Sequence, residues 1–169
     1  VTVKEVENIP YAYEISDYDY IAGLKSFQDG MYQIQDISSM LAGEYTAPKA
    51  GDTIVDVCGA PGGKSINAAL KMSEQGDCGR VIARDLSDYK VALIDENIKR
   101  LNITNIQTQV YDALDCDESL INKADIVIAD LPCSGLGIIG RKPDIKYNAS
   151  PEKLQSLVDL QRDILKVVS

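Results

Sequence analysis

Gly62, Gly63, Lys64 and Ser65 are the residue types that end a phosphate-binding P-loop. That pattern also requires a glycine at position 58, where this sequence has Cys58. Glycines carry no side chain and let the backbone approach a ligand closely. The stretch therefore leaves three interpretations open: a phosphate loop, a loop for another ligand, and a tight turn that holds no ligand.

Three aspartates that follow predicted strands narrow this choice. Asp85 comes 22 residues after Gly63, where nucleoside-binding folds place the acceptor for the ribose hydroxyls. Asp112 and Asp130 also end strands, and Asp112 could there meet an adenine amino group. Carboxylates in these positions suit an adenosine ligand of low negative charge and would repel a triphosphate. Taken alone, Asp85 and Asp112 could still be only turn or capping residues.

The elements that must position these residues alternate between strand and helix. Runs of β-branched residues predict strands, and apolar residues three and four apart predict helices. This alternation implies right-handed crossovers and a mostly parallel, doubly wound α/β sheet that binds ligands at the carboxyl ends of its strands. The predicted strands are 53–58, 80–85, 106–111 and 124–131, the predicted helices are 33–43, 64–72, 89–101 and 151–168, and 1–30 is expected to be irregular.

The composition bounds the class of protein. The chain has 169 residues, about one domain, and 45% of them are hydrophobic. It has no apolar run that could span a membrane, no histidine and no Cys-x-x-Cys pair, which argues against a membrane span and against a zinc site. Scattered single cysteines indicate a reducing, cytoplasmic setting. The cysteines are Cys58, Cys78, Cys116 and Cys133.

The net charge of −9 argues against a nucleic-acid partner, because contacts to phosphates need lysine and arginine. A net charge describes the average surface, however, and not one groove. The absence of histidine also means that acid–base chemistry must fall to carboxylates, lysine, tyrosine or cysteine.

The segment ADLPCSGLGIIGRKPDIKY, from Ala129 to Tyr147, is the most specific in the chain. It resembles motif IV and the following loop of the Sun-type, RsmB-like RNA cytosine-C5 methyltransferases. DVCGAPGGKS resembles that family's first motif, usually Asp-x-Cys-Ala-Ala-Pro-Gly-Gly-Lys-Thr, and QDGMYQIQDISSM resembles its preceding Gln-Asp-x-x-Ser motif. The departures are Gly59 for Ala, Ser65 for Thr and Leu131 for Ala, and none removes a group that the chemistry needs.

The resemblance covers roughly residues 23–169 and implies a Rossmann-like, class I methyltransferase domain that uses S-adenosylmethionine. Residues 1–22 would then be the end of a preceding module or a linker. The chain lacks an initial Met and ends at Ser169 inside a predicted helix, so we expect a fragment that stops before the last strands of the sheet.

The family's pattern also implies roles for individual residues. Asp85 would take the ribose hydroxyls, Asp112 would lie by the adenine, and Asp130 would lie near the methyl-bearing end of the cofactor. Lys64 would close the loop through an ion pair and would not bind phosphate. The residues expected to wrap the methionine and ribose are Cys58, Gly59, Ala60, Pro61, Gly62, Gly63 and Lys64.

The implied chemistry adds a thiolate to carbon 6 of cytosine, so that carbon 5 can attack the sulfonium methyl group. In this family, the cysteine of a later Thr-Cys motif forms that covalent bond, and the Pro-Cys cysteine, here Cys133, helps release the product. Because no Thr-Cys motif precedes Ser169, we expect this chain alone to be inactive. Asp130 could also contact the cytosine ring, and Arg141 and Lys142 could contact RNA.

Other functions stay open at this point. A nucleotide triphosphatase would use the glycine-rich loop for magnesium ATP, but Cys58 and the aspartates argue against it. A catalytically inactive, cofactor-binding RNA adaptor and a transfer-RNA methyltransferase are further alternatives. Ribosomal RNA of the small subunit is the expected partner, no membrane or metal is expected, and the oligomeric state is not indicated.

Overall fold

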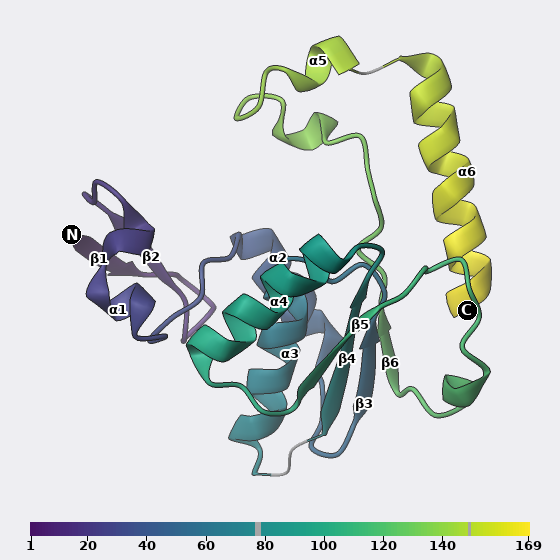
Figure 1. Ribbon diagram of the computed structural model, residues 1–169. Coiled ribbons are helices and arrows are strands. Elements are labelled where there is room, and N and C mark those ends of the chain that lie inside the picture. The colour runs from purple at the N-terminus through teal and green to yellow at the C-terminus, as the bar shows by residue number, and fades with distance from the viewer. Residues whose placement is uncertain (77–78, 149) are drawn as a thin grey trace. The chain divides into compact units, whose positions relative to one another are not determined.

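A computed structural model of the chain describes residues 1–76, 79–148 and 150–169 (Figure 1). Cys78 lies outside the described residues. The chain divides into two compact units, an amino-terminal unit of Val1–Gln33 and a main unit of Ile34–Ser169. The sequence boundary expected near residue 22, and the assignment of the first residues to a preceding module, stay predictions.

The amino-terminal unit contains a β-hairpin that the sequence did not reveal. Strands β1 (Thr2–Glu5) and β2 (Tyr13–Ser16) pair antiparallel and are followed by the short helices η1 (Ile21–Gly23) and α1 (Lys25–Gln28). The expectation of an irregular segment was therefore wrong. Both strands expose nearly every side chain, so they lack the alternation of buried and exposed residues by which a strand is recognised.

A parallel four-stranded sheet forms the centre of the main unit. Its strand order is β5-β4-β3-β6, and Ile54 lies level with Val81 on one side and Ile126 on the other. All four predicted strands are present, although β6 is shorter than expected because β3, its partner, turns away after Asp56. The strands are β3 (Thr53–Asp56), β4 (Arg80–Asp85), β5 (Ile106–Val110) and β6 (Ile126–Ile128).

Helices cover both faces of this sheet, so the predicted doubly wound α/β class is confirmed. Figure 1 shows α2, α3 and α4 on one face and α6 on the other. Helix α2 begins later than predicted because Asp36 has extended backbone angles. The main helices are α2 (Ile37–Thr46), α3 (Gly63–Glu74), α4 (Asp88–Leu101) and α6 (Pro151–Val168), and the short ones are η2 (Glu118–Leu120), η3 (Leu136–Ile138) and α5 (Ile145–Asn148). No helix of the described residues has the length and apolar character that crossing a membrane requires.

Successive residues of β3 supply the two hydrophobic cores. Ile54 points toward α3 and packs with Ala68, Met72 and Val81. Val55 points the other way and packs with Ile82 and with Ile164 of α6. Because side chains alternate along a strand, a continuously apolar strand is what a sheet covered on both faces requires.

The strand order creates a switch point. The chain proceeds from β3 outward to β4 and β5, and then crosses back to place β6 on the other side of β3. In open α/β sheets, a crevice opens where the connections diverge in this way, at the carboxyl ends of the two central strands. The residues that follow Asp56 of β3 and Ile128 of β6 therefore border the expected binding crevice.

We predict that α6 is essential for stability through Ile164, whose exposed fraction is 3%. Ile164→Ala removes a packed side chain and should lower the free energy of unfolding by about 2–5 kcal/mol. Urea denaturation followed by circular dichroism measures this change. Leu165→Ala is the matched control, since the neighbouring leucine is 49% exposed and should cost far less. Equal losses for the two variants would contradict the assigned core.

Candidate active site

The glycine-rich loop lies between β3 and α3 and is held in shape by its own backbone. The Gly62 amide donates to the Gly59 carbonyl at 2.6 Å, and the Gly59 amide donates to the Arg84 carbonyl at 2.7 Å. Gly62 has φ of +102°, and a Cβ there would lie 3.1 Å from Ile94 and 3.3 Å from Ile66. Only glycine meets both constraints, so this position fixes how closely the loop packs on α3 and α4.

Asp85, at the carboxyl end of β4, is joined directly to this loop. This residue is 3% exposed. One carboxylate oxygen accepts a hydrogen bond from the Ala60 amide at 3.2 Å, and the other accepts from the Leu86 amide at 2.8 Å and pairs with Lys90 at 3.0 Å. The predicted position of Asp85 at a strand end is correct. Its assignment to ribose hydroxyls stays a prediction.

Lys64 and Asp130 form an ion pair across the switch point. The Lys64 Nζ lies 2.6 Å from Asp130 Oδ2 and 3.4 Å from the Ser39 hydroxyl. Lys64 lies in the first turn of α3, the helix that follows β3, whereas Asp130 follows β6, so the pair joins the two central strand ends. This is the loop-closing contact expected for Lys64. It leaves the lysine with a carboxylate partner of its own, which disfavours the P-loop interpretation.

Asp56 is a buried acid that the sequence analysis did not single out. It is 1% exposed, and the Ser65 hydroxyl donates to its Oδ2 at 2.7 Å. Burial raises the pKa of Asp56 from 3.8 to about 6, against the opposing effect of the Ser65 hydrogen bond. The sequence signal for this residue was a carboxylate between two valines of a buried strand. In the structure, Asp56 is a protonatable group directly beneath the glycine-rich loop.

The two cysteines of the site differ in their surroundings. Cys58 is half-buried, and burial together with the charges of Asp85 and Asp56 raises its pKa to about 11. It is therefore a neutral thiol at pH 7 and a poor nucleophile. Cys133, on the loop after β6, is exposed. Gln161 of α6 donates to the carbonyl of the preceding Pro132 at 2.7 Å and so anchors this loop.

Asp112 lies at the carboxyl end of β5, as predicted, but its carboxylate serves a turn in this structure. Its Oδ1 accepts a hydrogen bond from the Leu114 amide at 2.9 Å. The turn role was one of the two interpretations of this residue. The contact to an adenine ring stays a prediction.

The predicted RNA contacts Arg141 and Lys142 are both exposed, on the segment between η3 and α5. Arg141 forms an ion pair with Asp36, just before α2, at 3.1 Å. Exposed pairs of this kind contribute little to stability, so Arg141 can exchange this partner for another anion at small cost.

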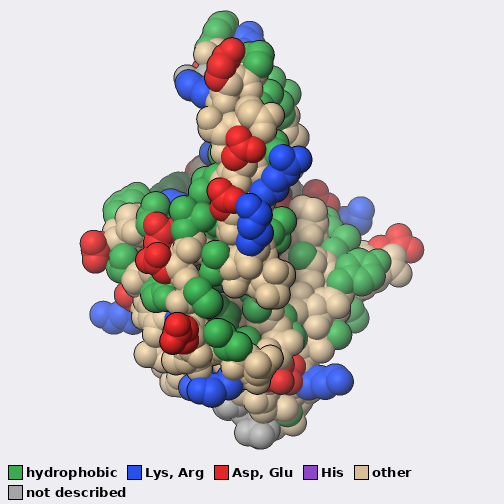
Figure 2. All heavy atoms as spheres, turned by 90° about the vertical axis from the view of Figure 1, so that its right-hand side faces the viewer, with side chains coloured by type: hydrophobic (Ala, Val, Ile, Leu, Met, Phe, Trp, Pro, Cys, Tyr) green, Lys and Arg blue, Asp and Glu red, His purple; other side chains and the backbone are tan. Residues whose placement is uncertain are grey.

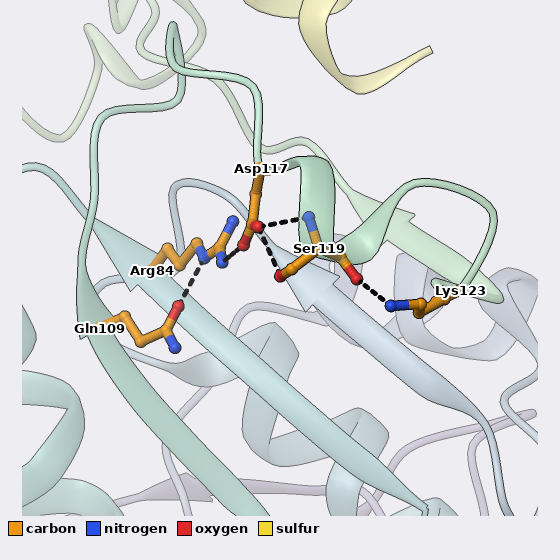
Figure 3. Close-up of polar contacts among 5 residues, drawn as sticks. All are labelled: Arg84, Gln109, Asp117, Ser119 and Lys123. Carbon is orange, nitrogen blue, oxygen red and sulfur yellow. Dashed lines mark hydrogen bonds and ion pairs between the residues drawn. The ribbon is translucent and has the colours of Figure 1, made fainter.

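A second polar network fixes the loop that carries Asp112 (Figure 3). The buried guanidinium of Arg84 donates to Gln109 at 2.8 Å, pairs with Asp117, and lies 4.1 Å from the centre of the Tyr111 ring. Hydrogen bonds from Ser119 and from Arg84 lower the pKa of Asp117 to about 2. Because Arg84 and Asp117 lie far apart in sequence, no local pattern could reveal this network.

A cavity of about 310 Å³ lies beside this network on the α6 face of the sheet. Its lining includes Arg84 and Tyr111, the exposed apolar residues Ile121 and Val127, and the end of α6 at Val168. Figure 2 faces α6 and shows hydrophobic side chains open to the surface on this side. The predicted cofactor residues 58–64, Asp85, Asp112 and Asp130 do not line it, so this cavity is separate from the site at the switch point.

Comparison with known proteins decides the family. The model of the family described as 16S rRNA methyltransferase RsmB/F matches residues 44–169. The chain belongs to the RsmB/F methyltransferase family. A relative from Bacillus subtilis, "Probable ribosomal RNA small subunit methyltransferase B", is 41% identical over 150 residues, which is 88% of this chain and 33% of that protein. The chain thus spans about a third of the length of the curated RsmB relatives it matches.

Solved structures agree with this family. The crystal structure of PH0851 matches 98% of this chain and 37% of its own, with a TM-score of 0.88 and 28% identity. NSun6 from Pyrococcus horikoshii, in a crystal structure with SFG, matches 89% of this chain and 37% of its own, with a TM-score of 0.75 and 29% identity. The parallel sheet therefore belongs to the Rossmann-like methyltransferases.

We predict that the raised pKa of Asp56 makes stability depend on pH. An acid with a higher pKa in the folded chain binds its proton more tightly when folded, so its contribution to stability is lost as pH rises from about 4 to about 6. Asp56→Asn keeps an acceptor for Ser65 and removes the titration. Wild type should therefore lose stability relative to this variant as pH rises. The unfolding free energy of Asp56→Asn minus that of wild type should increase by about 2–3 kcal/mol from pH 4 to pH 7.

Urea denaturation at a series of pH values measures this difference. Glu96→Gln, an exposed position on α4, is the control and should follow wild type throughout. A constant difference between Asp56→Asn and wild type over the same range would show that burial does not raise the pKa of Asp56.

We also predict a reactivity order for the cysteines. Near neutral pH, iodoacetamide should modify the exposed Cys116 and Cys133 readily. Cys58 should react about a hundredfold more slowly, since its pKa near 11 lowers the thiolate fraction by about two orders of magnitude. Peptide mass spectrometry over time follows each site. Modification of Cys58 as fast as Cys116 would contradict its assigned environment.

Proposed function

We propose that the chain is the cofactor-binding part of a cytoplasmic enzyme that transfers a methyl group from S-adenosylmethionine to carbon 5 of cytosine in small-subunit ribosomal RNA. Membership of the RsmB/F family supports methyl transfer to ribosomal RNA. One observation carries the proposal: the glycine-rich loop contacts the buried Asp85 carboxylate and, through the Lys64–Asp130 ion pair, the segment that leads to the exposed Cys133.

The residues at the switch point fit S-adenosylmethionine better than a nucleoside triphosphate. Asp85 presents a fixed carboxylate at the end of β4, the element from which a ribose acceptor is expected. Lys64, which a triphosphate would need, is paired with Asp130. A triphosphate would also meet three aspartates at neighbouring strand ends, and their charges would repel it.

The residues that would hold the cofactor are those of the loop and of the strand ends. When bound there, S-adenosylmethionine supplies an electrophilic methyl group. Asp85 would accept hydrogen bonds from the ribose hydroxyls, and Asp112 would lie toward the base. The loop residues in this set are Cys58, Gly59, Ala60, Pro61, Gly62, Gly63 and Lys64.

Cys133 and Asp130 would face the target cytosine. Both follow β6, and the contact from Gln161 to Pro132 holds the loop that carries Cys133. Asp130 keeps one carboxylate oxygen on Lys64, and the other can accept a hydrogen bond from the cytosine amino group. Cys133 presents an accessible thiol to the same base, which must be unstacked to reach it.

Calorimetric titration with S-adenosylhomocysteine tests the cofactor site. Wild type should bind it, and Asp85→Asn should weaken binding about 10- to 100-fold, because a charged hydrogen-bond acceptor is lost. Asp88→Asn, an exposed position at the start of α4, is the matched control and should bind as wild type. Circular dichroism checks that each variant is folded. If the chain binds magnesium ATP and does not bind S-adenosylhomocysteine, the proposal is overturned.

Tritium release tests the reaction itself. Ribosomal RNA and transfer RNA labelled at carbon 5 of cytosine are each incubated with the full-length protein and S-adenosylmethionine. Methylation at carbon 5 must release the tritium, and we expect release from small-subunit ribosomal RNA. Methyl transfer without tritium release would place the methyl group on another atom, and release from transfer RNA alone would change the substrate.

A further inference from the structure

Between the Cys133 loop and α6, the chain forms an exposed segment, Gly135–Tyr147, which we call the arm. It contains η3 and most of α5, and Figure 1 shows it leading away from the sheet before α6 returns. The arm exposes four large apolar side chains. These are Leu136, Ile138, Ile139 and Tyr147.

The charge of the arm is opposite to that of the rest of the chain. It contains three basic residues, Arg141, Lys142 and Lys146, and one acidic residue, Asp144, which give a net charge of +2. Since the whole chain carries −9, the other residues together carry −11. An anionic polymer that approaches this acidic chain therefore meets a favourable charge on the arm.

The end of the arm combines a cation with an open aromatic ring. Tyr147 is 78% exposed, and the Lys146 Nζ lies 4.8 Å from the centre of its ring. Proteins that bind single-stranded nucleic acids stack unpaired bases on such exposed rings and place cations along the backbone. A duplex offers no free base face to one aromatic side chain, so the pair suits an unpaired nucleotide.

A packing contact joins the two ends of the arm. A Cβ on Gly135 would lie 3.1 Å from Ile145 Cδ1, so Ile145 packs directly against Gly135. Gly135 is two residues from Cys133, and Ile145 is two residues from Tyr147. The arm therefore folds back on itself, so that α5 packs against Gly135, the residue that begins the arm two positions after Cys133.

We propose that α5 is a stacking platform for an unpaired nucleotide that flanks the target cytosine of the RNA. The Tyr147 ring stacks on the base, and Lys146 and Lys142 contact the neighbouring phosphates. This inference rests on the proposed RNA substrate and adds a specific binding element to it.

Fluorescence anisotropy with a labelled single-stranded RNA of about 12 nucleotides tests the platform. Tyr147→Ala should weaken binding about 10-fold, and Tyr147→Phe should bind as wild type because it keeps the ring. Lys146→Ala should weaken binding and reduce the dependence of affinity on salt by about one phosphate contact. Tyr45→Ala and Lys153→Ala, both exposed in the main unit, are controls that should leave binding unchanged.

The same variants are titrated with S-adenosylhomocysteine, which separates this inference from the proposed function. Weaker RNA binding with unchanged cofactor affinity supports the platform. If Tyr147→Ala binds RNA as wild type, if Tyr147→Phe is equally weakened, or if wild type binds no single-stranded RNA, the platform is overturned. Intact cofactor binding in those cases leaves the proposed cofactor site standing.

Discussion

The buried carboxylate of Asp85 is the constraint on which the candidate site depends. It accepts hydrogen bonds from the backbone of the glycine-rich loop and of its own strand end, and it pairs with Lys90 of the next helix. Three segments are thereby fixed to one side chain. A buried carboxylate is costly unless its oxygens are bonded, so the loop and α4 must both keep their places for the charge to be tolerated.

The sequence predicted what depends on local pattern. Apolar β-branched runs marked all four strands of the sheet, and the run from Arg80 to Asp85 placed Asp85 at a strand end. The hairpin of the amino-terminal unit was missed because its strands are exposed. Asp56 was missed although the valines on either side of it marked a buried strand, and the Arg84–Asp117 pair was missed because its members lie far apart in sequence.

The charge distribution shows why an average misleads. A net charge of −9 argued against a nucleic-acid partner, but it does not say where on the surface the acidic and basic residues lie. Asp85, Asp117 and Asp130 each pair with a basic residue of the fold. The arm carries a net charge of +2 and lies on the exposed segment that follows the Cys133 loop, where Arg141 pairs with the exposed Asp36. Local geometry, and not the total, decides which charges a ligand meets.

Helix α6 joins the core to the chemistry. Ile164 packs on the sheet, and Gln161, one turn earlier on the same helix face, holds the carbonyl of Pro132. A substitution that loosens the packing of α6 would displace Gln161 from the Pro132 carbonyl, even where most of the sheet keeps its structure. Changes in α6, far from the crevice, would then lower the activity of each folded molecule as well as the amount of folded protein, and a survey of variants by expression alone would see only the second effect.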